Sequence, residues 1–94
     1  MNRNMLAEQL QGRLGCTRSM SLNSVNAMME ILAQALSSGN DIFLRGFGTF
    51  RVAERKARKA RDIRHDRVIL VPAHKFVKFI PCQQIKDNLN NEQN

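Results

Sequence analysis

Lysine and arginine are concentrated in one part of this 94-residue chain. Nine of the fifteen lie between positions 45 and 67, where only three acidic residues accompany them, whereas residues 1–44 are neutral overall. Most of the net charge of +7 therefore falls in one quarter of the chain. Such side chains neutralise phosphates and release the counterions around a nucleic acid, so the pattern predicts a polyanionic partner. An ordinary solvated surface is the alternative interpretation of such a run.

The middle of this basic segment contains no side chain that can build a core. Alanine is the only apolar residue between positions 53 and 62, and no proline or glycine interrupts the stretch. We expect one strand from about residue 55 to 62 and a second from about 64 to 71. Paired as a β-ribbon, the outgoing strand would be roughly 26 Å long. With basic side chains on both faces, this ribbon is suited to a groove lined by phosphates.

Ile63 is the one large apolar residue near the expected tip of the ribbon, where it stands between Asp62 and Arg64. An exposed isoleucine adds nothing to its own core, but apolar side chains of this kind are used as wedges between base steps in the minor groove. We therefore expect Ile63 to be an intercalating wedge. The alternatives are that Ile63 supports the turn or packs against a neighbouring molecule.

Two helices are expected ahead of the basic segment. Leucine recurs every four residues from position 6 to position 14 and predicts a helix that starts at residue 2 or 3 and stops at Gly15. A second helix begins at a capping hydroxyl residue, Thr17 or Ser19, and ends in a Ser-Ser-Gly-Asn sequence. Its apolar stripe follows alternating spacings of three and four residues: Leu22, Val25, Met29, Leu32 and Leu36.

Beyond residue 41 the apolar period changes to two, which is typical of strands. A strand over residues 42–44, a Gly-Phe-Gly turn and a second strand with Phe50 and Val52 lead into the ribbon. After the return strand Pro72 interrupts the pattern, and a further strand precedes a short final helix. The predicted fold class is α+β: two N-terminal helices, a three-stranded antiparallel sheet with a long β-ribbon arm, and a short C-terminal helix.

All 94 residues are assigned to one domain, with a helical dimerisation base at 1–40, the sheet and arm at 41–80 and the final helix at 82–90. Without the arm about 75 residues remain, near the size at which a single core is only marginally stable. The broad stripe of the second helix and the phenylalanines would be partly exposed in a monomer, so we expect an obligate, intertwined dimer. Its core is assigned to Leu32, Leu36, Leu44, Phe47, Phe50 and Phe79.

Catalytic and metal-binding functions have little support. Cys16 and Cys82 are too few for a disulfide framework, so we expect buried thiols in a reducing compartment. Together with His65 and His74 they form no metal-ligand spacing, and no nucleophile with a nearby base indicates an enzyme. We therefore expect no metal, no cofactor and no catalysis. No apolar stretch is long enough to cross a membrane.

A single-stranded RNA-binding module is the alternative function. Residues 45–48 match the first four positions of the RNP1 signature. However, Thr49 and Val52 stand where that signature needs aromatic residues, and the chain begins with a helical pattern where the module needs a strand. Comparing affinities for duplex DNA and for single-stranded RNA separates the two functions.

A specific motif, Gly-Phe-Gly-Thr-Phe-Arg-Val, occupies residues 46–52, and it is followed by Glu-Arg at 54–55, Ala-Arg-Lys at 57–59 and Val-Pro-Ala at 71–73. With these residues the chain resembles the HU and integration host factor family of bacterial nucleoid proteins, without gaps from Met1 to about Asn90. The resemblance implies an intertwined dimer whose two β-ribbon arms reach around duplex DNA in the minor groove and bend it sharply.

The tip departs from the family pattern. Family members carry a proline that inserts between base pairs, within an Asn-Pro-x-Thr-Gly sequence. Here residues 62–66 read Asp-Ile-Arg-His-Asp, so Ile63 takes the place of the proline and Asp66 that of the turn glycine. Because Ile63 lacks the rigid ring, we expect a more mobile tip and a weaker or more variable kink.

The expected partners are double-stranded DNA and a second chain, either identical or a paralogue, in the cytoplasmic nucleoid. Low sequence specificity is expected, because residues 51–71 contain no Asn or Gln to contact base edges and the minor groove is degenerate. The DNA-binding residues are assigned as Arg45, Arg51, Arg55, Lys56, Arg58, Lys59, Arg61, Ile63, Arg64, Arg67, Lys75, Lys78 and Lys86.

Overall fold

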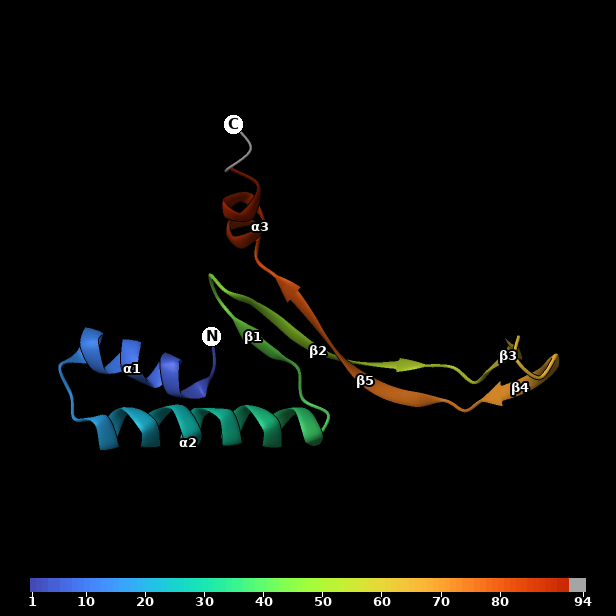
Figure 1. Ribbon diagram of the computed structural model, residues 1–94, viewed down its shortest axis with the longest axis horizontal. Helices are drawn as coiled ribbons and strands as arrows, with labels where there is room; N and C mark the ends of the chain where they lie inside the picture. The colour runs from blue at the N-terminus through green and yellow to red at the C-terminus, as the bar shows by residue number, and fades with distance from the viewer. Residues whose placement is uncertain (92–94) are drawn as a thin grey trace. The chain divides into compact units, whose positions relative to one another are not determined.

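The computed structural model describes residues 1–91 and contains three helices and five strands within them (Figure 1). The expected α+β class and element order are confirmed. The chain divides into a helical unit, Met1–Ser38, and a second unit that starts at Gly39 and holds all the strands. The elements are α1 (Arg3–Leu14), α2 (Arg18–Ser37), β1 (Ile42–Leu44), β2 (Gly48–Arg55), β3 (Arg58–Asp62), β4 (Arg67–Val71), β5 (His74–Pro81) and α3 (Gln83–Asn90).

Local capping chemistry sets the ends of the first two helices. The Asn2 side chain accepts a hydrogen bond from the Met5 amide at 2.9 Å, and the Thr17 hydroxyl accepts one from the Met20 amide at 3.1 Å. Between the helices Gly15 adopts a left-handed conformation with φ of 65°, and its amide donates to the Gln11 carbonyl. These caps satisfy backbone groups that a helix end leaves unpaired, so the helix boundaries follow from the sequence.

The helical unit has a very small core of its own. Among residues 1–91 only Ala7 and Val25 are buried apolar side chains, and the buried Ser21 hydroxyl donates to the Arg18 carbonyl at 2.9 Å. Most of the large apolar side chains of α2 remain exposed or half-buried, among them Met28 and Ile31. A water-facing apolar surface of this extent on one chain indicates that another surface covers it.

The three-stranded sheet is antiparallel in the order β1-β2-β5. Gly48, at the start of β2, faces Pro81, and a Cβ at this position would lie 2.6 Å from the Ile80 carbonyl oxygen and 2.8 Å from the Phe79 ring. Glycine is therefore required here for close packing. The Phe79 ring lies between Phe47 and Phe50, with centroid separations of 5.4 Å and 4.7 Å.

The arm consists of β3, β4 and the turn between them at residues 63–66. One continuous ribbon was expected, with strands over 55–62 and 64–71, but Arg55 belongs to β2 and pairing stops at residues 56–57 and 72–73. The register is the same on both sides of this break and places Ala57 opposite Pro72. Because Pro72 has no backbone N–H to donate, the ladder is interrupted there without an inserted residue.

The cysteines differ from expectation. Cys16 and Cys82 are free thiols, but both are half-buried instead of buried. Cys82 precedes α3, where its amide donates to the Phe47 carbonyl at 2.8 Å and its thiol to the Gly46 carbonyl at 3.3 Å. These bonds tie the start of α3 to the Gly-Phe-Gly turn, so Cys82 has a structural role. None of the helices in residues 1–91 has the length and apolarity to cross a membrane.

Candidate nucleic-acid interface

The two faces of the three-stranded sheet differ in chemistry. Arg51 lies opposite Lys78 and Arg55 opposite His74 across β2 and β5. Since successive side chains alternate and directly opposed ones share a face, Arg51, Arg55 and Lys78 lie on one face, which we call the basic face. The other face, the apolar face, carries side chains of all three strands: Ile42, Leu44, Phe50, Val52, Val77 and Phe79.

The cations of the basic face are exposed, and one of them is held by an aromatic ring. The guanidinium carbon of Arg55 lies 4.9 Å from the centre of the Phe76 ring, which is within the range of a cation–π interaction. This contact orients Arg55 while leaving its N–H groups accessible. Lys75 was assigned to DNA contact together with Lys78, but it is opposite Glu54 and lies on the other face of the sheet.

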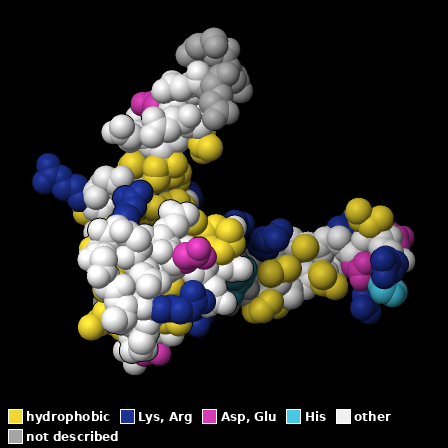
Figure 2. Space-filling model, turned by 60° about the vertical axis from the view of Figure 1, so that its left-hand side comes forward, with side chains coloured by type: hydrophobic (Ala, Val, Ile, Leu, Met, Phe, Trp, Pro, Cys, Tyr) yellow, Lys and Arg dark blue, Asp and Glu magenta, His cyan; other side chains and the backbone are white. Residues whose placement is uncertain are grey.

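The arm carries cations on both of its faces. On one face Lys59 lies opposite Leu70 and Arg61 opposite Val68; on the other Arg58 lies opposite Val71. The basic side chains of β3 are all exposed, and Val68 and Leu70 are exposed beside them. Hydrophobic side chains are visible along the arm in Figure 2, and charged side chains and histidine gather at its end. The sequence pattern marked residues 68–71 as apolar, but only the register shows which basic residues they adjoin.

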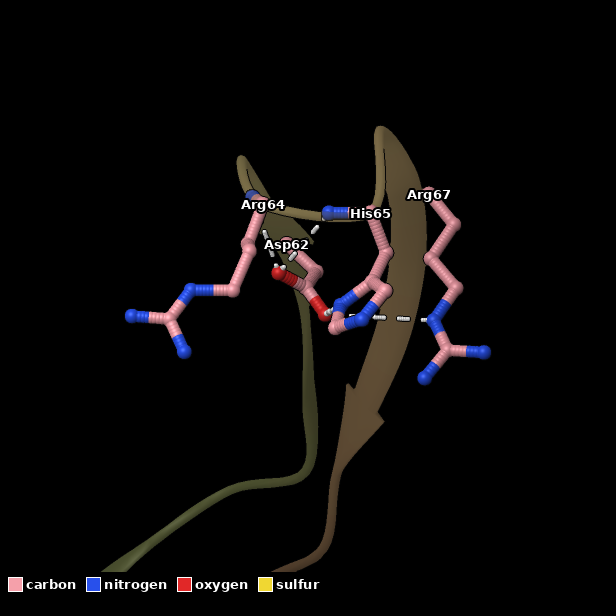
Figure 3. A network of polar contacts seen from close by, with 4 residues as sticks. All are labelled: Asp62, Arg64, His65 and Arg67. Carbon is pink, nitrogen blue, oxygen red and sulfur yellow. Dashed lines mark hydrogen bonds and ion pairs between the residues drawn. The ribbon is translucent and has the colours of Figure 1, made fainter.

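Ile63 is at the arm tip and is 89% exposed. Next to it, the Asp62 carboxylate accepts hydrogen bonds from the Arg64 amide at 3.1 Å and from His65 Nδ1 at 2.8 Å, and it lies 3.8 Å from Arg67 Nε (Figure 3). Asp66, which has a positive φ of 46°, forms an ion pair with Arg61. The two tip acids therefore engage neighbouring basic side chains.

Comparison with known proteins identifies the family. A model of the family described as bacterial DNA-binding protein matches residues 1–90. The chain belongs to this family. The DNA-binding protein HRL53 of Rhizobium leguminosarum is 33% identical over 90 residues, covering 96% of this chain and 99% of that protein. The SPbeta prophage-derived DNA-binding protein HU 2 of Bacillus subtilis is 34% identical over 87 residues, covering 93% and 95%.

Solved structures support the same assignment to the bacterial DNA-binding protein family. The chain matches the Anabaena HU–DNA cocrystal structure with a TM-score of 0.85 and 26% identity, covering 97% of this chain and 99% of that one. An HU mutant from Thermotoga maritima, 22% identical, has the same fold with a TM-score of 0.69 over 96% of this chain and all of that one. The family resemblance inferred from the sequence is confirmed.

In this bacterial DNA-binding protein the remaining basic residues assigned to DNA contact are dispersed. Arg45 is in the turn between β1 and β2, Lys56 lies in the break between β2 and β3, and Lys86 is on α3. All three side chains are exposed. Within residues 1–91 no group of three or more His, Cys, Asp or Glu side chains is placed to hold a metal ion.

Proposed function

We propose that the protein is a histone-like DNA-binding protein of the nucleoid that binds duplex DNA in the minor groove and bends it with low sequence specificity. The observation that carries this proposal is the arm, a two-stranded ribbon with exposed cations on both faces and an exposed isoleucine at its tip. A ribbon of this kind fits between two phosphate backbones. The match to an HU structure solved with DNA supports the same partner.

The basic face supplies the second part of the proposed site. With Arg51, Arg55 and Lys78 on the face opposite the apolar one, the sheet offers phosphate contacts while its apolar face remains available for packing. Contacts of this type fix the position of the duplex but carry no sequence information. Selectivity is then expected to follow how easily the DNA deforms, so nicked and pre-bent DNA should bind more tightly than linear DNA.

We further propose that two copies, or this chain and a paralogue, assemble as the DNA-binding unit. Leu44, Phe47 and Phe79 of the proposed dimer core are exposed in one chain, and Leu32, Leu36 and Phe50 are half-buried. An apolar groove of about 420 Å³ also runs between α1 and α2, lined by Leu6, Leu10, Val25, Met28, Met29 and Leu32 among others. A second chain would remove this surface from water, which is the dominant favourable term in association.

The RNA-binding alternative has no comparable support. The first element of the chain is α1, where the RNA-binding module needs a strand. The sheet that contains the Gly-Phe-Gly turn has three strands within residues 1–91, whereas the RNA-recognition motif (RRM), which carries the RNP1 signature, has its aromatic residues on a four-stranded sheet. The matching family and the similar curated proteins are named for DNA binding. A direct comparison of duplex DNA with single-stranded RNA tests this, and stronger binding to RNA would favour the alternative.

Ile63→Ala is expected to reduce DNA bending, because it removes the side chain proposed to enter the base stack. Without the isoleucine side chain between the bases, binding to linear duplex should also weaken by roughly tenfold. Energy transfer between dyes at the two DNA ends measures the bend, and titration measures the affinity. Ile69→Ala is the matched control, because it removes the same atoms from β4, away from the tip. Unchanged energy transfer with Ile63→Ala would contradict the wedge role.

Arg64→Ala is expected to weaken duplex binding more than Arg61→Ala. Arg61 is already paired with Asp66, whereas no partner for the Arg64 guanidinium is found in the described part of the chain. An unpaired cation is free to neutralise a phosphate, and removing one from each of the two arms of a dimer should make the slope of log K against log salt shallower by about 2. Titrations of both variants over a salt series measure this. Equal slopes for the two variants would contradict the ranking.

A further inference from the structure

We propose that Asp62 is a positioning residue for the arm tip: its carboxylate fixes the turn that presents Ile63 and Arg64 to the minor groove. This inference rests on the proposed function and concerns how the wedge is held. The turn between β3 and β4 has neither proline nor glycine to set its backbone. Some other group must therefore stabilise it.

The carboxylate of Asp62 accepts hydrogen bonds from two backbone amides of the turn. Oδ1 lies 3.1 Å from the Arg64 nitrogen and 3.4 Å from the His65 nitrogen. An aspartate that bonds to backbone two residues further along forms an Asx-turn, which mimics a backbone turn. The Asp62 side chain is only 23% exposed, although the neighbouring Ile63 is 89% exposed.

The second carboxylate oxygen fastens the turn to the returning strand. Oδ2 lies 2.8 Å from His65 Nδ1 and 3.8 Å from Arg67 Nε. Because an ionised carboxylate only accepts hydrogen bonds, Nδ1 is the protonated ring nitrogen. Asp62, the last residue of β3, is also paired with Arg67, the first residue of β4, so the contact closes the ladder where the turn begins.

This arrangement decides which side chains point outward. His65 and Arg67 turn toward the Asp62 carboxylate, while the Arg64 side chain extends away from it (Figure 3). Ile63 stands between Asp62 and Arg64, and the Arg64 amide is held by the Asp62 carboxylate. If the turn is ordered before DNA is bound, less conformational entropy is lost when Ile63 inserts between base pairs. In this chain the Asx-turn can restrict the backbone of the tip, as the rigid ring of a proline at position 63 would.

Simple charge counting predicts the opposite role for Asp62. A carboxylate near the tip repels phosphates, so removing it should tighten binding and leave the bend unchanged or larger. A positioning role predicts that removing it reduces the bend. The two explanations therefore differ in the sign of one measured change.

The experiment compares Asp62→Ala, Asp62→Asn and Glu54→Gln in the full chain on an end-labelled linear duplex. Asp62→Ala is expected to lose about half or more of the energy-transfer change on binding, in the same direction as the loss expected for Ile63→Ala. Asp62→Asn keeps an oxygen that accepts from the turn amides, so its bend is expected to stay near wild type. Glu54→Gln removes the same charge from β2 and controls for charge alone.

A measurement on the free protein tests the turn directly. Amide hydrogen exchange at Arg64 is expected to be about fivefold faster in Asp62→Ala than in wild type and little changed in Asp62→Asn, since the alanine variant lacks one hydrogen bond of ordinary strength. Far-ultraviolet circular dichroism checks that each variant is folded. Wild-type bending by Asp62→Ala, or equal loss in Asp62→Asn, would overturn the positioning role.

The outcomes separate this inference from the proposed function. If the wild-type protein fails to bind duplex DNA, the proposed function is wrong, whatever the exchange data show. If the wild-type protein binds and bends DNA and Asp62→Ala does so equally well, only the role of Asp62 is wrong.

Discussion

Raising the salt concentration from about 50 to 200 mM is expected to weaken binding to duplex DNA by about four orders of magnitude. Eight basic residues lie between positions 51 and 67, on the arm, in the break before it and on the basic face, so a dimer would present twice that number. If about half of them neutralise phosphates, the slope of log K against log salt should be near −7, since each contact contributes about −0.9. The reason for the large effect is entropic, because each neutralised phosphate releases a condensed counterion.

Fluorescence titrations at four or more salt concentrations measure this slope. Lys59→Gln is a useful companion variant, because Lys59 is exposed on the arm and has no ion pair among residues 1–91. Because the substitution removes one cation from each of two arms, its slope should be shallower by about 2. An affinity that does not change with salt would contradict phosphate neutralisation as the source of binding. It would also remove the main support for the arm as the DNA-binding element.

The helices and the sheet were predictable because local chemistry determines them. Gly15 and Thr17 adopt the capping roles that their types suggest, and the change of apolar period after residue 41 marks the first strand. The Gly-Phe-Gly turn was likewise predictable, because its first residue, Gly46, has a φ of 81°, a conformation that glycine adopts readily. In each case residues close in sequence decide the outcome.

The surface that each basic residue occupies was not predictable in the same way. Lys75 and Lys78 are three residues apart and fall on opposite faces, but which face is basic depends on their pairing with β2, more than twenty residues earlier. The stacking of Arg55 on Phe76 depends on the same register. The break in the ribbon also required the register, because Pro72 acts through its position opposite Ala57.

At the arm tip, the sequence predicted the exposure of one residue but not the contacts around it. Ile63 was expected to be exposed, and it is. The contacts of Asp62 and Asp66 depend on the conformation of the turn, including a positive φ at Asp66 that aspartate adopts more readily than most residues. The sequence therefore predicts an exposed apolar residue at the tip, whereas the contacts of the turn around it are visible only in the structure.

Phe79→Ala is expected to lower the melting temperature by roughly 20 °C or more, because removing a packed phenylalanine costs about 3–5 kcal/mol and small domains lose several degrees per kcal/mol. Phe79 lies on β5, on the apolar face, where it contacts Phe47 and Phe50 and packs against Gly48. Its ring is still 40% exposed in one chain, and we propose that the second chain covers the remainder.

The same variant tests assembly. If folding is coupled to dimerisation, the melting temperature of the wild-type protein should rise with protein concentration, and Phe79→Ala should shift sedimentation toward smaller species at micromolar concentration. Phe43→Ala is the matched control, since it removes the same ring from the opposite face of the sheet, where Phe43 is 74% exposed. Its melting temperature should change by only a few degrees. A wild-type protein that sediments as a stable folded monomer, with a melting temperature independent of concentration, would contradict the dimer, because the apolar face would then be stable in water without a partner.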